Sequence, residues 1–234
     1  MALPKINGTP KYNMVVPSTQ QAVRFRPFLV KEEKVLMIAM ESNDNIQMLN
    51  AIVDTLDACI ENGINKESLA TFDVEYMFTK LRSKSVGETS TVGVNCEECK
   101  EQNEVKIDLD SLEMKVPKLD TFLEIDENIS IEMKWPSFLD LVKIVPESSN
   151  TTDQVFSILR SCLSAIHTGD ERIDLNDETA EEIQEFIESM NREQFDKLQK
   201  FVESMPALSH DVKFECVECK HNNNIKLQGM QSFF

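Results

Sequence analysis

Apolar side chains recur every three or four residues in the first third of the chain, which is the spacing of helices that bury one face. This pattern predicts a helix from Val30 to about Ser42 and a second one along Leu49–Ile60 that ends near Gly63. A third helix is predicted over residues 66–83. The N-terminal half of the chain is therefore expected to be mainly helical.

The same spacing returns in the second half of the chain. A short helix is expected from Pro136 to Ile144, and a longer one from Thr152 or Asp153 to Gly169. Two more helices are predicted at residues 178–190 and 191–206, the second of them opening with a capping-box pattern at Asn191. Residues 150–206 are thus expected to form a helical insertion.

Strict alternation of apolar and polar residues marks the predicted strands. It occurs at residues 22–26 and 129–135. It also flanks two Cys-x-x-Cys pairs: Val92 and Val94 precede the first pair, and Val105 follows it. Each pair is therefore expected to lie on a turn between two strands.

The two cysteine pairs belong to a sequence repeat. Residues 92–100 return 120 positions later as residues 212–220, and the match continues through Asn103 and Asn223. Two thiols on one tight turn bind one side of a tetrahedral ion, and a second such turn completes four-sulfur coordination of Zn²⁺. The sequence therefore predicts one structural zinc ion in a zinc ribbon, with four ligands: Cys96, Cys99, Cys216 and Cys219.

Other uses of these residues remain open. A disulfide or a redox pair also has the form Cys-x-x-Cys, but a redox pair normally opens a helix beside a βαβ unit. His221 is an alternative ligand that ranks below the cysteines, because four matched thiolates leave no vacancy. Cys59 and Cys162 fall on apolar helix faces, so we expect them to be small buried hydrophobic residues.

A metal shared by the two pairs would close the intervening chain into a loop. Closure costs several kcal/mol of chain entropy, whereas structural zinc contributes on the order of 10 kcal/mol. The expected fold class is α+β, mostly helical, with a small antiparallel ribbon that joins the middle of the chain to the C-terminus. Its expected parts are an extended basic arm with a short strand (1–30), a helical part (31–88), the ribbon (89–115 with 208–234) and a strand and helical insertion (116–207).

Length and composition suit a soluble protein with one large or two small domains, since 41% of the 234 residues are hydrophobic. No apolar run reaches the roughly 18–20 residues that span a bilayer, and the start of the chain lacks the layout of a signal peptide. We therefore expect a cytoplasmic location, where thiols stay reduced and available to metal, and no membrane partner.

The net charge of −17 argues against sequence-independent binding to nucleic acid, which depends on neutralising phosphates with Lys and Arg. The charge is unevenly placed: residues 1–30 carry +4 and the rest of the chain carries −21. This basic arm is expected either to lie across an acidic surface, its own or a neighbour's, or to remain a solvated tail.

No catalytic motif is present in the sequence. It contains no Gly-rich phosphate loop, nucleophile elbow or His-Glu-x-x-His pair, and its three histidines have no companion at the spacing of a triad. The carboxylates at residues 178–185 fit the solvated face of a helix. We therefore expect neither an enzyme nor a small-molecule substrate. Phe233 and Phe234 are expected to pack beside the ribbon or to fill a partner's groove.

Three features form a recognisable combination: the segment Pro17–Lys34 with its Val-Arg-Phe-Arg-Pro-Phe-Leu-Val core, the paired cysteine turns, and the closing segment Phe214–Phe234. Together they resemble the baseplate hub proteins of T4-like contractile-tailed bacteriophages, a family that includes the baseplate hub subunit and the hub assembly catalyst. Lys100 and Lys220 depart from the glycine that many zinc knuckles carry at this position.

The resemblance implies a non-enzymatic role in building the central hub of the tail baseplate. The implied partners are other hub components or the tape-measure protein, met in the host cytoplasm during assembly and, for a retained subunit, in the virion tail. The alternatives are a tail assembly chaperone that leaves the particle, a zinc-ribbon regulator that binds nucleic acid, and a thiol oxidoreductase.

Overall fold

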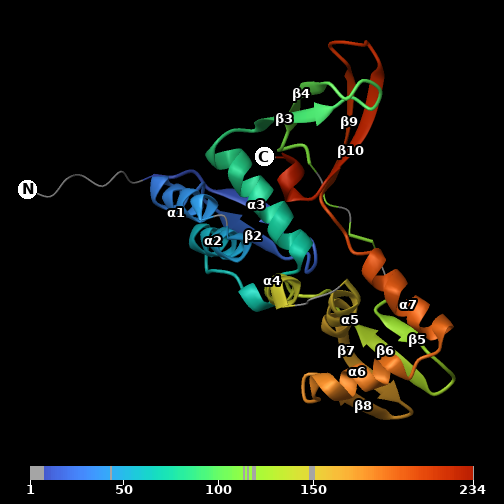
Figure 1. The fold of residues 1–234 in the computed structure, drawn as a ribbon. Helices are drawn as coiled ribbons and strands as arrows, with labels where there is room; N and C mark the ends of the chain where they lie inside the picture. Colours follow the sequence, from blue (N-terminus) through green and yellow to red (C-terminus); the bar gives the residue numbers. More distant parts are fainter. Residues whose placement is uncertain are drawn as a thin grey trace, which may run out of the picture. The chain divides into compact units, whose positions relative to one another are not determined.

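The computed structural model describes residues 8–42, 44–112, 114, 116–117, 120–147 and 151–233 (Figure 1). The chain divides into two compact units, and each is interrupted in sequence. The first unit takes its described residues from Met1–Lys66, Phe72–Lys115 and Ala207–Phe234. The second takes them from Glu67–Thr71 and Val116–Pro206.

The first unit begins with an antiparallel hairpin of β1 (Tyr12–Val15) and β2 (Ala22–Phe25). Met14 and Val16 are buried, so this part of the arm contributes to the core. Lys11 forms an ion pair with Glu61 on the same unit. The described part of the basic arm therefore packs against its own chain and pairs with one of its acidic residues, in line with the expectation that the arm lies on an acidic surface.

Three helices follow this hairpin: α1 (Val30–Glu41), α2 (Asn45–Cys59) and α3 (Thr71–Ser85). Asp44 caps α2 by accepting hydrogen bonds from two backbone N–H groups of the first turn. The prediction that α2 reaches Gly63 was too long, because the helix ends at Cys59. The third helix begins later than predicted, since residues Lys66–Ser68 form a separate 3₁₀ turn, η1.

The core of the first unit lies beneath these helices. Its members are side chains that are at most 2% exposed and come from β2, α2 and α3. They include Phe25, Ile52, Leu56, Phe72, Met77 and Leu81. Burial of large apolar side chains is the main stabilising contribution to a unit of this size.

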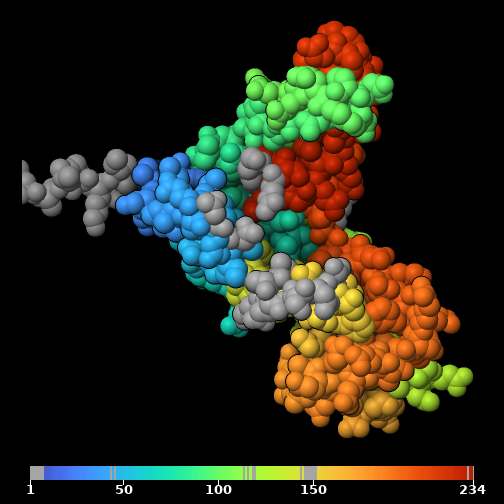
Figure 2. All heavy atoms as spheres, in the orientation of Figure 1, coloured from blue at the N-terminus to red at the C-terminus, as the bar shows by residue number. Residues whose placement is uncertain are grey.

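Two further hairpins complete the first unit: β3 (Thr89–Asn95) with β4 (Gln102–Asp108), and β9 (Ser209–Glu215) with β10 (Asn222–Gln228). Each is a separate two-stranded antiparallel sheet. Figure 2 shows the hairpins in contact, the first in green and the second in red. Their buried faces share one apolar cluster: Val92, Val94, Ile107, Leu109, Leu112, Leu208, Val212, Leu227 and Phe233.

The last turn of the described chain, η2 (Met230–Phe233), packs against these hairpins. Phe233 is fully buried in their shared cluster. The expectation that the terminal aromatic residues pack beside the ribbon is therefore confirmed for Phe233, while Phe234 lies outside the described residues.

The second unit is built on a four-stranded antiparallel sheet in the order β5-β6-β7-β8. The strands are β5 (Phe122–Glu124), β6 (Ile129–Met133), β7 (Leu163–Thr168) and β8 (Glu171–Asp174). The helices are α4 (Phe138–Glu147), α5 (Thr151–Cys162), α6 (Ala180–Glu188) and α7 (Arg192–Glu203). The sheet, α5, α6 and α7 share one apolar core, in which Trp135 stacks on Phe201 with ring centroids 4.7 Å apart.

The predicted helix from residue 152 or 153 to Gly169 was wrong in its last third. It ends at Cys162, and Leu163 continues directly into β7. Leu159, Cys162 and Ile166 satisfy helical spacing, but residues 163–168 pair with β6 on one side and β8 on the other. Tertiary pairing therefore decided the structure of this segment, as it often does for short apolar runs.

The expected helical insertion at residues 150–206 was accordingly wrong, because it contains two strands. The α+β class is confirmed, but the expectation of a mostly helical chain was also wrong. Helices account for 40% of the described residues and strands for 27%.

The predicted capping box at the start of the last long helix is confirmed. The Asn191 side chain accepts from the Gln194 N–H, and the Gln194 side chain accepts in return from the Asn191 N–H. Thr179 and Glu182 form the same arrangement at the start of α6. In the part of the chain that the structure describes, no helix has the length and apolar character needed to cross a membrane.

Candidate metal centre

Each cysteine pair lies on a tight turn at the tip of a hairpin. In the first turn, the Cys96 N–H donates to the Glu101 carbonyl at 2.8 Å and the Lys100 N–H donates to the Cys96 carbonyl at 3.1 Å. The second turn has the same bonds at matching positions: the Cys216 N–H donates to the His221 carbonyl at 2.9 Å, and the Lys220 N–H donates to the Cys216 carbonyl at 3.1 Å. The sequence repeat is therefore also a structural repeat.

The two lysines that replace glycine adopt the backbone conformation that glycine favours. Lys100 has φ +64° and Lys220 has φ +59°, both in the left-handed region. The departure from glycine thus leaves the shape of the turns unchanged, and its cost is local backbone strain.

The turns bring the four predicted cysteines together. Their sulfur atoms all lie within 4.8 Å of one another. Cys96 Sγ is 3.6 Å from Cys219 Sγ, and Cys99 Sγ is 3.5 Å from Cys216 Sγ. A tetrahedral zinc ion with bonds of about 2.3 Å separates its sulfur ligands by about 3.8 Å. The spacing and the donor type of this four-thiol group therefore fit a bound metal ion.

Burial divides the four thiols into two kinds. Cys96 and Cys216 are fully buried, whereas Cys99 and Cys219 are exposed. Each close sulfur–sulfur pair joins a buried thiol of one hairpin to an exposed thiol of the other. A metal held by the group would consequently join the two hairpins, and not only the two ends of one turn.

The surrounding donors favour thiolates at the buried positions. Burial opposes ionisation of Cys96, but the N–H groups of Cys99 and Glu98 and the Asn223 amide lower its pKa to about 6. The pKa of Cys216 is lowered chiefly by the Cys219 N–H. A cation among the thiols would favour the ionised form of all four.

The exposed thiols behave in the opposite way. The Glu101 N–H stabilises the Cys99 thiolate, but the neighbouring cysteines and burial outweigh it and raise the pKa of Cys99 to about 12. The pKa of Cys219 is raised as well: the His221 N–H favours the thiolate, but burial and the Cys96 and Cys216 thiols oppose it more strongly. Without a cation, the buried thiols therefore ionise more readily than the exposed ones.

Asn103 and Asn223 contact the four-thiol group, and the sequence had marked them only as part of the repeat. Both are 3% exposed. The Asn223 Nδ2 lies 3.5 Å from Cys96 Sγ, and the Asn103 Nδ2 lies 3.7 Å from Cys216 Sγ. Each asparagine follows the first cysteine of its own pair by seven positions, and this shared spacing is the signal that could have identified them.

The remaining candidates lie elsewhere. Among the described residues, the group of side chains that could hold a metal ion consists of the four cysteines. His221 does not belong to this group, and its carbonyl accepts hydrogen bonds within the turn. Cys59 and Cys162 are 2% and 1% exposed, which confirms them as buried core residues. Burial raises the pKa of Cys59 to about 11 and that of Cys162 to about 12, so both thiols stay protonated.

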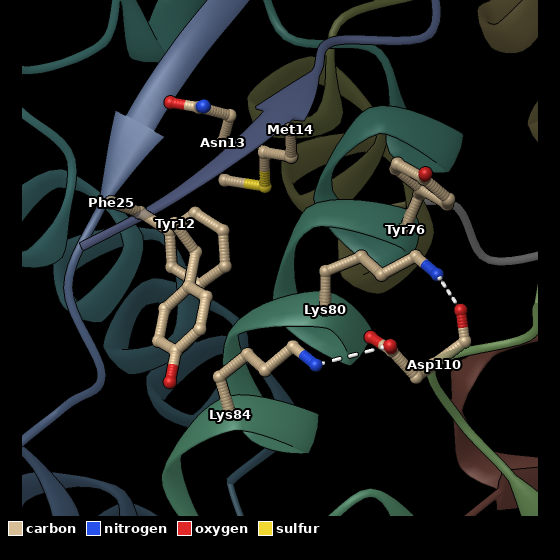
Figure 3. A pocket seen from close by; sticks show the side chains of 8 residues that line it. All are labelled: Tyr12, Asn13, Met14, Phe25, Tyr76, Lys80, Lys84 and Asp110. Atoms are coloured by element: carbon tan, nitrogen blue, oxygen red, sulfur yellow. Dashed lines mark hydrogen bonds and ion pairs between the residues drawn. The ribbon is translucent and has the colours of Figure 1, made fainter. Parts of the chain in front are cut away.

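A pocket of about 340 Å³ lies between the β1–β2 hairpin and α3 (Figure 3). Met14 and Phe25 belong to its lining, together with Lys80 and Lys84 of α3. Lys84 Nζ lies 3.0 Å from Asp110 Oδ2, and Lys80 donates to the Asp110 carbonyl. Both lysines therefore already have partners within the protein, and their contacts with Asp110 connect α3 to the segment that follows β4.

The fold and the four-thiol group define a two-unit α+β protein with a candidate structural metal centre. The model of the family described as T4 bacteriophage base plate protein matches residues 9–234. The chain therefore belongs to the T4 bacteriophage base plate protein family, which confirms the resemblance to T4-like baseplate proteins. No curated protein and no solved structure matches it.

Proposed function

We propose that this protein is a non-enzymatic component of a contractile phage tail that forms the central hub of the baseplate or promotes its assembly. The observation that carries the proposal is the family match over residues 9–234. The hub-specific part of the proposal has a second support, which is the resemblance of Pro17–Lys34 and of the closing segment to hub proteins. The proposed partners are other hub proteins or the tape-measure protein. The proposal includes no binding to nucleic acid or to a small-molecule substrate.

The second part of the proposal is a structural zinc ion in a zinc ribbon formed by the two hairpins. Four thiolate ligands leave no open coordination position for water, so such an ion holds the fold together and does not act in catalysis. A two-stranded hairpin is marginally stable by itself. The support for the proposal is that the four thiols of the two hairpins converge within 4.8 Å.

A surface suited to protein partners lies on α1. Its exposed apolar residues include Val30 at 79%, Met37 and Ile38 at 56% each, and Met40 at 63%. Residues 35–40 of α1 are apolar at every position, so this half of the helix lacks the polar face that an amphipathic surface helix normally presents to solvent. Exposed apolar patches mark protein–protein contacts, and we assign this surface to the baseplate partner.

Co-expression with hub and tape-measure proteins, followed by affinity capture, tests the partner assignment. We expect capture by the unmodified protein and its loss in Met37→Glu and Met40→Glu. Val155→Glu is the control, since Val155 is an exposed apolar residue on α5 of the second unit. Failure of the unmodified protein to capture any hub or tape-measure protein would refute the assignment, and mass spectrometry of purified virions would separate a retained subunit from a departing chaperone.

Elemental analysis tests the metal. We expect one zinc ion per chain, and its loss in Cys216→Ser. If the protein is purified without metal and takes up no zinc on titration, the zinc-site proposal is refuted, while the baseplate assignment is unaffected.

A further inference from the structure

We propose that Asn103 and Asn223 are the positioning residues of the four-thiol site and that they hold its two halves together before a metal binds. The inference rests on the zinc site proposed above, but it concerns contacts made entirely within the protein. It assigns a role to a second pair of repeated residues, distinct from the cysteines.

The two side chains cross between the hairpins. Asn223, on β10, accepts through Oδ1 from the Glu97 N–H of the opposite cysteine turn at 2.8 Å. Asn103, on β4, accepts in the same way from the Val217 N–H at 2.9 Å. Each hairpin therefore satisfies a backbone donor of the other.

The orientation of each carboxamide follows from its partners. A backbone N–H can only donate, so it must face the amide oxygen. The amide nitrogen then faces the acceptors: Asn223 donates to the His221 carbonyl at 3.0 Å and to Cys96 Sγ, and Asn103 donates to the Glu101 carbonyl at 2.8 Å and to Cys216 Sγ. The carboxamide of each asparagine is thus fully used inside the site.

The asparagines serve the two thiols that solvent cannot reach. Cys96 and Cys216 are fully buried, and a buried thiolate needs hydrogen-bond donors in place of water. Cys99 and Cys219 are exposed and are solvated directly. The pairing of asparagine with buried cysteine is the arrangement required to stabilise a metal site rich in negative charge, because partners around the ligands orient them and adjust their affinity.

These contacts need no metal. The crossed bonds use only backbone and side-chain groups of the protein, and the apolar cluster beneath them joins the same two hairpins. The order of assembly that follows is docking of the hairpins first and metal binding second. Zinc then enters a preformed site instead of having to fold one.

Amide hydrogen exchange in the metal-free protein tests the crossed contacts. We expect Asn223→Ala to accelerate exchange at the Glu97 N–H but not at the Val217 N–H, and Asn103→Ala to do the reverse. Asn224→Ala is the matched control, because Asn224 is an exposed asparagine of the same strand. Local unfolding of one hairpin would not produce this crossed pattern.

Competition titration with a chromophoric chelator measures how each asparagine substitution changes the affinity for zinc. We expect each alanine variant to lower zinc affinity about 10- to 100-fold, the usual effect of removing a partner of a ligand, and Asn224→Ala to leave it unchanged. If an alanine variant fails to fold, Asn223→Asp replaces it. This variant keeps the acceptor for Glu97 but loses the donor to Cys96, so zinc affinity should fall while the Glu97 N–H stays protected.

Two results would overturn the proposal: free exchange at both amides in the unmodified metal-free protein, or alanine variants that bind zinc as tightly as Asn224→Ala. If the unmodified protein binds no zinc but the two alanine variants show the crossed exchange pattern, the metal site is ruled out and the positioning contacts are supported. The failure of each proposal is therefore distinguishable.

Discussion

Asp73 is completely buried and accepts two hydrogen bonds from Ser18, one from the backbone N–H at 2.8 Å and one from the hydroxyl at 2.6 Å. Ser18 lies between β1 and β2, and Asp73 lies in the first turn of α3. The contact therefore ties the N-terminal hairpin to the central helix of the first unit. It also gives a structural role to the Pro-Ser-Thr segment noted in the sequence.

Removal of the Ser18 hydroxyl should destabilise the first unit. A hydrogen bond to a charged group contributes about 1.5–3 kcal/mol, so we expect Ser18→Ala to lower the free energy of unfolding by about that amount. Urea denaturation followed by circular dichroism measures the change. Thr19→Ala, at the exposed neighbouring position, should stay within about 0.5 kcal/mol of the unmodified protein, and equal stability of the two variants would contradict the prediction.

Glu32 should make the stability of the first unit depend on pH. Burial raises the pKa of Glu32, but hydrogen bonds from Arg26, the Leu29 N–H and Lys31 outweigh it and lower the pKa from 4.5 to about 2. Because the folded-state pKa is depressed, the stabilisation is fully present above pH 4.5 and is lost as the pH falls towards 2.

The test compares Glu32→Gln with the unmodified protein by denaturation at several pH values. The variant should be less stable above pH 4.5, and the difference should shrink as the pH approaches 2. Glu33→Gln, on the exposed side of α1, is the control. A difference that stays constant with pH would show that Glu32 acts through packing alone.

Glycine at the left-handed positions should stabilise the cysteine turns. Lys220 has φ +59°, a conformation that costs a residue with a side chain about 1–2 kcal/mol and costs glycine almost nothing. We expect Lys220→Gly to raise the unfolding midpoint of the zinc-loaded protein. Lys220→Ala separates the effects, because it removes the same side chain but keeps the backbone strain; a gain of equal size in both variants would contradict the explanation.

Metal removal should affect the first unit and spare the second. Trp135 is the only tryptophan and stacks on Phe201 in the core of the second unit, so its fluorescence reports on that unit alone. With chelator present, circular dichroism should detect an earlier transition, while the Trp135 transition keeps its midpoint. A matching shift in both signals would show that the units unfold together.

The cysteine group could be predicted because its information is local and doubled. Each Cys-x-x-Cys pair lies between alternating strands, and the copy at Cys216 repeats the copy at Cys96. Capping boxes such as that of Asn191 are local in the same sense. Their hydrogen bonds join residues three positions apart, so their pattern survives in the sequence.

The features that the sequence did not predict depend on contacts between distant segments. Leu163–Thr168 has a spacing compatible with a helix and becomes a strand only because β6 and β8 lie on either side of it. The role of Asn103 is visible only once the opposite turn, with Val217, lies against it. A polar residue in a strand gives no indication of which distant backbone group it will meet.

The separation of the two cysteine pairs also sets a sequence of events during translation. Ribosomes add about 5–20 residues per second, so Cys96 is synthesised roughly 6–24 s before Cys216. Residues 116–206 of the second unit are all made before Cys216, so the first two thiols are present without the other two while that segment is synthesised. A nascent chain that stalls in this interval carries one unpaired cysteine turn, which makes the length of the pause a determinant of how much protein reaches its closed form.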